Sequence, residues 1–474
     1  MKTFKGHTGP VPLLTTTADG KHIISNSIDS TTRLWNIETG KEIAMLAGFK
    51  DGEWITITAE GYYDCSENGD KHINVRIGNN VYGIDNYRET FYRPELVKLA
   101  LSGGKIEGMV TLEDVKSAPD VSIVNTPNNP DTDEVTVTLK ITDVGGGIGD
   151  IKLFLNGTAI VLDSRGIAII SKDDKSIIKS YKIKIINGKN IIKAIVFNKD
   201  NTMQSNEAVY EITAAVKTLI RPSLYGIVIG IKDFKNPKLE LKYTVADAEL
   251  FAESMTACGS GLFEKVIINK LTTSEETTKE NIINEMKKMQ NINPEDLFVF
   301  YVASHGTVRD GEYFLLTSNV GSTSTDKLKK DSISQNELKE LIANIPSAKK
   351  LIILDTCNAG ALGDAIQVAM LARGMSEDTA IRVLSRAIGT TILSASMSTQ
   401  EAMEGYLGHG IFTYVISEGL KGNADSDNDG FIKTTELANY VDDEVPVLAE
   451  KAFNRAQYPV VSPSGQGFPI GKVK

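Results

Sequence analysis

The chain has 474 residues with 41% hydrophobic and 24% charged residues, which is ordinary for a globular protein and long enough for two or three domains. Its net charge of −10 argues against nucleic acid as a partner, and no apolar run reaches the ~18 residues of a membrane span, so we expect no membrane partner either. Three cysteines and no apolar leader predict a cytoplasmic protein without a disulfide framework.

Residues 1–50 are predicted to form a small β segment. Gly6-His7 opens the chain, Ile23-Ile24 is strand-like, and Leu34-Trp35-Asn36 follows. The stretch resembles one WD repeat, the blade of a β-propeller, with Asn36 in place of the usual Asp. A single blade cannot close a ring, because each blade buries its faces against neighbours. Either this piece of sheet docks on the body of the protein or the chain starts late in a longer one. Trp35 is interpreted as ordinary core packing.

Residues 51–102 are predicted to form an aromatic-rich β/α module, followed by a linker over residues 103–119. A strand is expected from Trp54, and a helix from Pro94, because proline suits the first turn of a helix. We interpret the aromatic side chains as core, since a stacking platform for nucleic acid would need interleaved Arg and Lys.

Residues 120–216 contain short alternating apolar runs separated by Asn, Asp and Gly. Strands at a spacing of ~8–12 residues predict a β-sandwich of immunoglobulin-like type. We expect these N-terminal β modules to serve as a spacer or as the docking site of a regulatory protein.

Residues 222–474 alternate between strand and helix patterns, which predicts an α/β domain with a mostly parallel sheet. Two of its apolar runs end in polar residues, the first in Ser304-His305-Gly306 and the second in Asp355-Thr356-Cys357. Ligands of such sheets sit outside the carboxyl ends of the strands. If the two strands are neighbours, His305 and Cys357 therefore lie side by side over one crevice.

An imidazole beside a thiol makes a nucleophile at neutral pH, since a free thiol titrates near ~8.5 and the thiolate is the reactive form. Each residue has a simpler interpretation by itself. Cysteine is usually a small buried hydrophobe, and a histidine after a strand often only bonds the backbone. The pairing favours catalysis, because both residues end apolar runs and glycine follows each closely.

Ser304-His305-Gly306 and Asp355–Gly360 together resemble the caspase/metacaspase superfamily of cysteine peptidases, and the likeness extends from about Leu224 to the C-terminus. The 52-residue gap between His305 and Cys357 agrees with the ~50 residues found in caspases. The resemblance implies a protein or peptide substrate and no organic cofactor. Cys357 would be the nucleophile and His305 the general base and then acid. The backbone N–H groups of Gly306 and Cys357 would form the oxyanion hole.

The resemblance also implies a basic specificity. Asp355 stands where caspases carry Gln, as in metacaspases, and Asp247 stands at a second acidic position of the same pocket. Two carboxylates in a shielded slot favour a guanidinium or ammonium group before the cleaved bond. For Asp247 the alternative is an acid in the first turn of a helix, where the helix dipole favours it.

The stretch from Ala361 to Gly389 lies where caspase-like enzymes join their two subunits, and it carries Arg373, Arg382 and Arg386. An Arg-specific enzyme would be able to cut itself after these residues. The alternative is a packed helix pair with solvated arginines.

Residues 425–436 match the calcium loop of an EF-hand, in which oxygen ligands recur at fixed positions. The expected Ca²⁺ ligands are Asp425, Asp427, Asp429, the Phe431 carbonyl and Glu436. The alternative is an Asp/Gly turn in which Thr434 caps the following helix.

The sequence thus predicts a multidomain protein with N-terminal all-β segments and a C-terminal caspase-like domain. A calcium-supported cysteine endopeptidase is the leading interpretation of its function. The competing interpretation is a non-catalytic scaffold, in which the WD-repeat-like and immunoglobulin-like parts bind partners and the caspase-like domain is regulatory.

Overall fold

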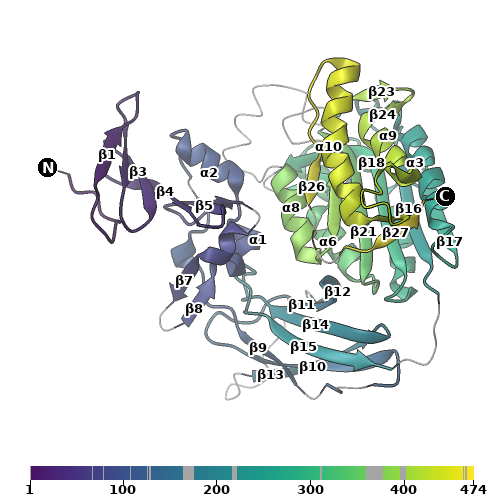
Figure 1. Ribbon diagram of the computed structural model, residues 1–474, viewed down its shortest axis with the longest axis horizontal. Helices are drawn as coiled ribbons and strands as arrows, with labels where there is room; N and C mark the ends of the chain where they lie inside the picture. The colour runs from purple at the N-terminus through teal and green to yellow at the C-terminus, as the bar shows by residue number, and fades with distance from the viewer. Residues whose placement is uncertain are drawn as a thin grey trace.

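The computed structural model describes residues 2–66, 68–77, 80–106, 108–124, 126–127, 130–163, 176–215, 221–309, 312–358, 377–395, 402–462, 464 and 467–473, without the side chains of residues 77, 80, 357, 358 and 377. Figure 1 shows an N-terminal sheet at the left, a β-sandwich below and an α/β domain at the right. Among the helices of the described residues, none combines the length and apolar character that a membrane crossing needs.

The N-terminal sheet is antiparallel, and its strands follow one another in sequence order. They are β1 (Leu13–Thr16), β2 (His22–Asn26), β3 (Thr31–Asn36), β4 (Glu42–Gly48), β5 (Trp54–Thr58) and β6 (Tyr63–Cys65). Because β4 pairs with β5, one sheet crosses the domain boundary that we expected at residue 50. The blade-like segment is therefore a continuation of the aromatic-rich module.

Trp35 does more than fill the core of this sheet. Its side chain is buried, and its Nε1 donates a hydrogen bond of 2.8 Å to Ser25 Oγ. The same hydroxyl lies 2.8 Å from His7 Nε2, while His7 Nδ1 lies 3.0 Å from Asp29 Oδ2. These polar contacts connect His7, which precedes β1, to β2, to β3 and to the turn between them. They also supply hydrogen-bond partners for buried polar atoms.

The aromatic-rich module also contains a hairpin of β7 (Asn74–Ile77) and β8 (Asn80–Gly83) and the helices α1 (Arg88–Phe91) and α2 (Pro94–Leu101). The expected helix start at Pro94 is confirmed. Its tyrosines and Phe91 are buried together, as the sequence predicted, whereas Trp54 is 43% exposed and lies outside this core. The expected linker packs on this module, since Tyr62 OH donates to the Val110 carbonyl (2.6 Å).

Two antiparallel sheets form the β-sandwich that the strand spacing predicted. One holds β9 (Asp120–Val124), β10 (Glu134–Thr142) and β13 (Ser176–Lys184), and the other holds β11 (Ile151–Leu155), β12 (Thr158–Asp163), β14 (Gly188–Val196) and β15 (Ala208–Ala214). Alternate residues of β10, from Val135 to Ile141, are buried in the core shared by the two sheets. This period of two is that of a strand with one buried face.

The central sheet of the α/β domain has the strand order β17-β16-β18-β21-β22-β26, with β19 and β20 continuing from β18. The pairs among β17, β16, β18, β21 and β22 are parallel, whereas β26, β19 and β20 pair antiparallel. The strands are β16 (Leu224–Gly230), β17 (Val266–Leu271), β18 (Leu297–Arg309), β19 (Glu312–Leu315), β20 (Ile333–Ser334), β21 (Lys349–Asn358), β22 (Thr391–Ser394) and β26 (Val460–Ser462).

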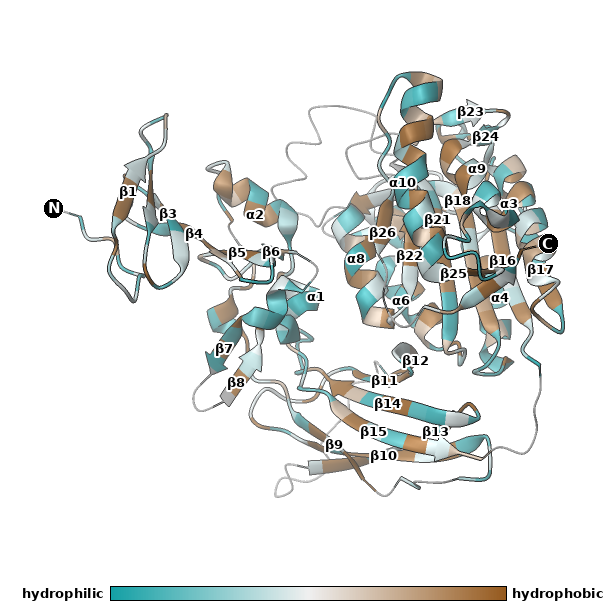
Figure 2. Cartoon of the chain, in the orientation of Figure 1, coloured by the Kyte–Doolittle hydropathy of each residue, from teal (hydrophilic) through white to brown (hydrophobic). Residues whose placement is uncertain are grey.

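Helices cover both faces of this sheet, so its strands are apolar on both sides (Figure 2). One face carries α4 (Lys279–Lys288), α5 (Thr325–Asp331), α6 (Gln335–Ala343) and α8 (Glu377–Ile388), and the other carries α3 (Thr244–Gly259), α9 (Ile411–Glu418) and α10 (Thr434–Phe453). Along β18, Phe298, Phe300 and Val302 pack on the first face. Leu297, Val299, Tyr301 and Ala303 pack on the second.

The sandwich is joined to the α/β domain by buried polar contacts. Lys350 is fully buried, and its ammonium donates to the carbonyl oxygens of Ala159 in β12 (2.6 Å) and Ile342 in α6 (2.8 Å). Thr158 Oγ1 donates to the Ala348 carbonyl (2.9 Å). These bonds satisfy groups that would otherwise be costly to bury, and they fix the sandwich against the sheet.

Candidate active site

The two strands that carry His305 and Cys357 are neighbours. β18 and β21 pair in parallel from Leu297 opposite Lys349 to Gly306 opposite Asn358, and in this register His305 lies opposite Cys357. Both strands extend beyond the residues that the apolar pattern indicated. β18 continues into a hairpin with β19, and β21 stays paired with β18 as far as Asn358. The two residues therefore belong to the last paired positions of the strands rather than to the loops after them.

The side chain of His305 is held by the backbone of a neighbouring segment. Its Nε2 lies 3.0 Å from the carbonyl oxygen of Leu239, which ends a short 3-10 helix (Pro237–Leu239). A carbonyl only accepts, so Nε2 carries the proton and Nδ1 is the basic nitrogen of the neutral ring. The ring of Phe234 packs against the imidazole with a centroid distance of 5.5 Å.

No sequence pattern indicated Leu239 or Phe234 as neighbours of His305, because any residue offers a carbonyl and any aromatic residue suits a core. The side chain of Cys357 lies outside the described part of the structure. Its role as nucleophile, and the backbone oxyanion hole of Gly306 and Cys357, stay predictions.

Asp247 in α3 and Asp355 in β21 line one pocket, and that this pocket binds a substrate side chain stays a prediction. Both carboxyl groups are almost buried. Asp247 Oδ1 accepts a hydrogen bond from the Gly410 N–H (3.0 Å) and lies 3.2 Å from His409 Nδ1. Asp355 Oδ2 accepts from Thr413 Oγ1 (2.5 Å) and from Tyr301 OH (3.3 Å).

The surroundings of the two carboxyl groups raise the pKa of both. Burial raises the pKa of Asp247, and the neighbouring charge of Asp355 raises it further. Burial also raises the pKa of Asp355, against the opposing effect of the hydrogen bonds from Thr413 and Tyr301. Two carboxylates that share a desolvated site cannot both ionise freely, so the pocket favours a cation that relieves their repulsion.

Asp247 also fits its alternative interpretation, since it lies in the first turn of α3. However, its carboxylate bonds to the Gly410 N–H rather than capping its own helix. Its position in the first turn is therefore shown, while its role in binding a substrate side chain stays a prediction.

Further residues complete the pocket, and the sequence patterns did not single them out. A Cβ at Gly410 would lie 3.3 Å from Asp247 Oδ2 and 3.7 Å from Asp355 Oδ2, so glycine leaves the space between the two acids open. The rest of the lining is made by Thr244, Ala303, Ser304, Ala402, Met403, Glu404, Phe412 and Gln457. Ser304 directly precedes His305 in β18, so the pocket and the histidine lie at the same end of this strand.

The expected self-cleavage residues lie partly outside the described part of the chain. Arg373 is among the residues that the structure does not describe, whereas Arg382 and Arg386 lie within α8. The α8 helix packs on β22 and β26, and both arginines are half-buried. Their peptide bonds are helical, so cleavage after either residue would require α8 to unwind. Self-cleavage stays a prediction.

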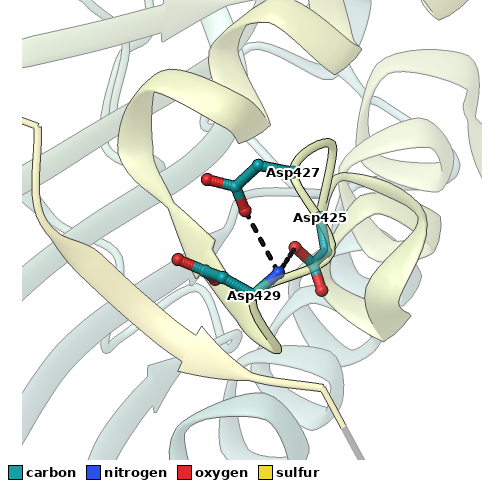
Figure 3. Close-up of side chains that lie close together, drawn as sticks. All are labelled: Asp425, Asp427 and Asp429. Carbon is teal, nitrogen blue, oxygen red and sulfur yellow. Dashed lines mark hydrogen bonds between the residues drawn. The ribbon is translucent and has the colours of Figure 1, made fainter.

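The predicted calcium loop brings its first three acids together (Figure 3). One oxygen of each of Asp425, Asp427 and Asp429 lies within 4.8 Å of the others. Asp425 Oδ1 and Asp427 Oδ1 accept hydrogen bonds from the Asp429 N–H (3.1 and 3.2 Å). Gly430 has a φ of 81°, which permits the sharp turn at the centre of the loop.

The other two expected ligands have structural roles in the same loop. Phe431 begins β25 (Phe431–Lys433), which pairs with β27 (Pro469–Lys472). Glu436 accepts a hydrogen bond from the Lys433 N–H (2.9 Å) at the start of α10. The helix begins at Thr434, so this residue is not the cap that the alternative interpretation assumed.

A cationic side chain lies among these acids. The ammonium of Lys433 is 2.7 Å from Asp427 Oδ2 and 2.6 Å from Asp429 Oδ2. Hydrogen bonds to Asp427 and then to Asp429 raise the pKa of Lys433. The donor set suits a hard divalent cation, but such an ion has to compete with this lysine.

One family model, that of the caspase domain, a peptidase domain, matches residues 225–466. These are 242 of the 474 residues, which is just over half of the chain. The matched span contains every residue of the pocket and both candidate catalytic residues.

Curated relatives include eukaryotic translation initiation factor 3 subunit I from Xenopus tropicalis and from Homo sapiens, each 46% identical over 44 residues. The match covers 9% of this chain and 14% of each relative, so the chain spans only a small part of their length.

Solved structures similar to parts of the chain include two from other organisms. The CARDB domain of a Pyrococcus furiosus protein in complex with di-metal ions is 14% identical, over 22% of this chain and 99% of that chain, with a TM-score of 0.17. A β-propeller domain from Myceliophteria thermophila is 10% identical, over 43% of this chain and 75% of that chain, with a TM-score of 0.12. Both scores are too low to support a statement about the fold.

Proposed function

The chain belongs to the caspase-domain family of peptidases, and on that premise we propose that it is a cysteine endopeptidase that cleaves proteins or peptides after Arg or Lys. The observation that carries the proposal is the register of β18 and β21, in which His305 lies opposite Cys357. The acidic pocket at the same end of β18 as His305 supports the basic specificity.

In the proposed mechanism the Cys357 thiol gives its proton to Nδ1 of His305, and the thiolate attacks the carbonyl carbon of the scissile bond. The N–H groups of Gly306 and Cys357 stabilise the oxyanion; one such donor is typically worth ~3–4 kcal/mol in the transition state. His305 then protonates the leaving amine, and the C–N bond breaks to leave a thioester. Water, deprotonated by His305, hydrolyses the thioester and restores the thiol.

No side-chain acid is needed to orient the base in this scheme. The Leu239 carbonyl accepts the proton of Nε2, which keeps Nδ1 as the basic nitrogen through the first step. When His305 becomes an imidazolium, the same carbonyl dipole stabilises its positive charge. This arrangement supports a dyad rather than a triad.

The basic specificity follows from the charges of the pocket. A guanidinium or ammonium group between Asp247 and Asp355 neutralises their repulsion and forms charge-assisted hydrogen bonds with oxygens that are already shielded from water. An Asp side chain would add a third carboxylate and would be rejected. Glu404 at the lining of the pocket strengthens this preference, because its charge also raises the pKa of Asp247.

The test is a comparison of fluorogenic peptides that differ only in the residue before the cleaved bond. We expect hydrolysis of Arg- and Lys-ending peptides and none of the Asp-ending peptide. A preference for the Asp-ending peptide would contradict the assignment of the pocket, while hydrolysis of no peptide would favour the second candidate function.

That second candidate is a non-catalytic scaffold with a regulatory caspase domain. The observation that favours it is the edge strand β1, whose residues are all exposed, with 66% of Leu13 and 64% of Leu14 accessible. An open edge strand with apolar side chains is a surface for pairing with another chain. Docking of a regulatory protein there is also compatible with the peptidase proposal.

A further inference from the structure

The N-terminal sheet has an open edge at β1. This strand ends the sheet, and its outer side pairs with none of the residues that the structure describes. All four of its residues are exposed, and Leu13 and Leu14, whose side chains point to opposite faces of the sheet, are 66% and 64% accessible. Figure 1 shows β1 on the side of the sheet that faces away from the α/β domain. The edge and both faces of this strand are therefore accessible to another chain.

Two residues of β1 direct their backbone N–H and C=O groups to the outer side of the strand. The Thr17 N–H donates to the His22 carbonyl (3.0 Å), so these two residues form a hydrogen-bonded pair in the register of β1 with β2. Antiparallel strands alternate between hydrogen-bonded and non-hydrogen-bonded pairs. Counting back from Thr17, every second residue of β1 therefore bonds to β2. The residues between them, Leu14 and Thr16, have their backbone groups on the open side.

This edge carries no charge that would repel a second strand of the same sequence. Residues 8–18 contain no Asp, Glu, Lys or Arg, although 24% of the whole chain is charged. The other strands that end sheets of three or more described strands either carry a charged residue or, like β20 and β26, are largely buried. The charged residues are Asp64 in β6, Asp120 in β9, Asp163 in β12, Lys179 in β13, Glu211 in β15 and Lys270 in β17. Charges on an edge strand deter pairing with another chain, and β1 lacks this protection.

We propose that β1 pairs antiparallel with β1 of a second copy of this chain, across a two-fold axis at Thr15. Leu14 of one copy then lies opposite Thr16 of the other, and the outward N–H and C=O groups of both residues form hydrogen bonds. An axis at Leu14 would instead set Thr16 opposite Pro12, which has no N–H to donate, and would leave the Thr16 carbonyl without a donor. A second copy suits this edge because a two-fold axis sets the strand against itself, and an uncharged strand meets no like charge there.

The seam between the two copies is short, since β1 has four residues. It is well below the ~1,200 Å² that stable interfaces bury, so we expect a dimer that dissociates on dilution. Sedimentation velocity of the full chain, without peptide substrate, measures this over concentrations up to about 1 mM. We expect a monomer at the lowest concentrations and a dimer at the highest. A monomer throughout, or an assembly that grows beyond the dimer, would overturn the proposal, and a monomer would leave β1 as a docking site for a different protein.

A charge at the two-fold axis tests the register. Thr15→Lys sets two ammonium groups opposite each other and should weaken dimerisation at least tenfold, whereas Thr15→Gln, which is long but neutral, should not. Lysine at Val209, which is exposed on the edge strand β15, is the control (Val209→Lys) and should leave the dimer unchanged.

Two further measurements separate repulsion at the axis from misfolding. Added salt should restore part of the Thr15→Lys dimer, because it screens the repulsion. An equimolar mixture of Thr15→Lys and Thr15→Glu should dimerise at least as well as wild type, because opposite charges then meet at the axis. Unchanged dimerisation of Thr15→Lys alone, or a mixture that stays monomeric, would overturn the pairing. None of these measurements depends on the proposed peptidase activity.

Discussion

The imidazole of His305 and the backbone carbonyl of Leu239 are joined by a hydrogen bond of 3.0 Å at Nε2. In a Ser-His-Asp triad a buried carboxylate holds the histidine in the tautomer that its role as a base requires. Here the backbone carbonyl of Leu239 has this position at Nε2, so a neutral group orients this side of the imidazole. The geometry depends on the backbone of residues 237–239 rather than on a side chain that a substitution would remove.

The first prediction concerns substrate affinity in the acidic pocket. Asp355→Asn keeps the volume of the side chain but removes the charge that pairs with a substrate guanidinium. Loss of one partner of a buried charge pair costs about 2–5 kcal/mol, so kcat/KM for Arg-ending peptides should fall at least ~30-fold. Steady-state kinetics measure this, with exposed Asp442→Asn as the control. A variant that retains wild-type kcat/KM would show that Asp355 does not contact the substrate.

The second prediction concerns pH and stability. Since burial raises the pKa of Asp247 and Asp355 in the folded protein, the folded state binds more protons than the unfolded state, and stability falls as pH rises from ~3.9 through the raised values. Asp247→Asn/Asp355→Asn removes this dependence. The double variant should therefore gain stability relative to wild type as pH rises. Parallel curves of unfolding temperature against pH for the two proteins would contradict the coupling.

The sequence was sufficient to predict the residues that share the edge of the central sheet. His305 and Asp355 each follow an apolar run of a parallel strand, and the carboxyl ends of such strands meet in one place. The architecture followed in the same way, because strand spacing and strand-helix alternation are local patterns. The sheet that runs through residue 50 was missed, since the pairing of β4 with β5 depends on a hairpin whose two strands we assigned to different modules.

The hydrogen-bond partners of the candidate site residues could not be predicted from the sequence, because tertiary packing brings them to the site. Thr413, Gly410 and the Leu239 carbonyl reach the site through tertiary packing, and none of these groups carries a pattern of its own. Lys433 is different, because it lies within the calcium motif, so its competition with Ca²⁺ for the acids could have been predicted from the sequence.

The third prediction concerns calcium. The ammonium of Lys433 already pairs with Asp427 and Asp429, so Ca²⁺ has to displace it. Lys433→Gln should bind Ca²⁺ a few-fold more tightly than wild type, a modest gain because exposed ion pairs are weak. Asp427→Ala should bind Ca²⁺ more weakly. Calorimetry measures both affinities, and the same affinity in all three proteins would mean that the loop is only a turn.

The fourth prediction concerns self-cleavage. A peptide has to be extended to enter a protease crevice, and the bonds after Arg382 and Arg386 are helical. If the active enzyme cuts itself, we expect mass spectrometry to find new termini after Arg373, Arg382 or Arg386, and none in Cys357→Ala; cleavage after Arg382 or Arg386 requires α8 to unwind. A single intact chain throughout catalysis would exclude self-processing as a requirement for activity.

The central claim is that Cys357 and His305 act together on a peptide bond, and the turnover of an Arg-ending fluorogenic peptide by purified wild type, Cys357→Ala and His305→Ala tests it most directly. Unfolding temperatures of the three proteins verify that each variant is folded. We predict turnover by wild type and no detectable turnover by either variant, because the thiolate cannot form or cannot attack once one partner is gone. Retained activity in folded Cys357→Ala or His305→Ala would contradict the account.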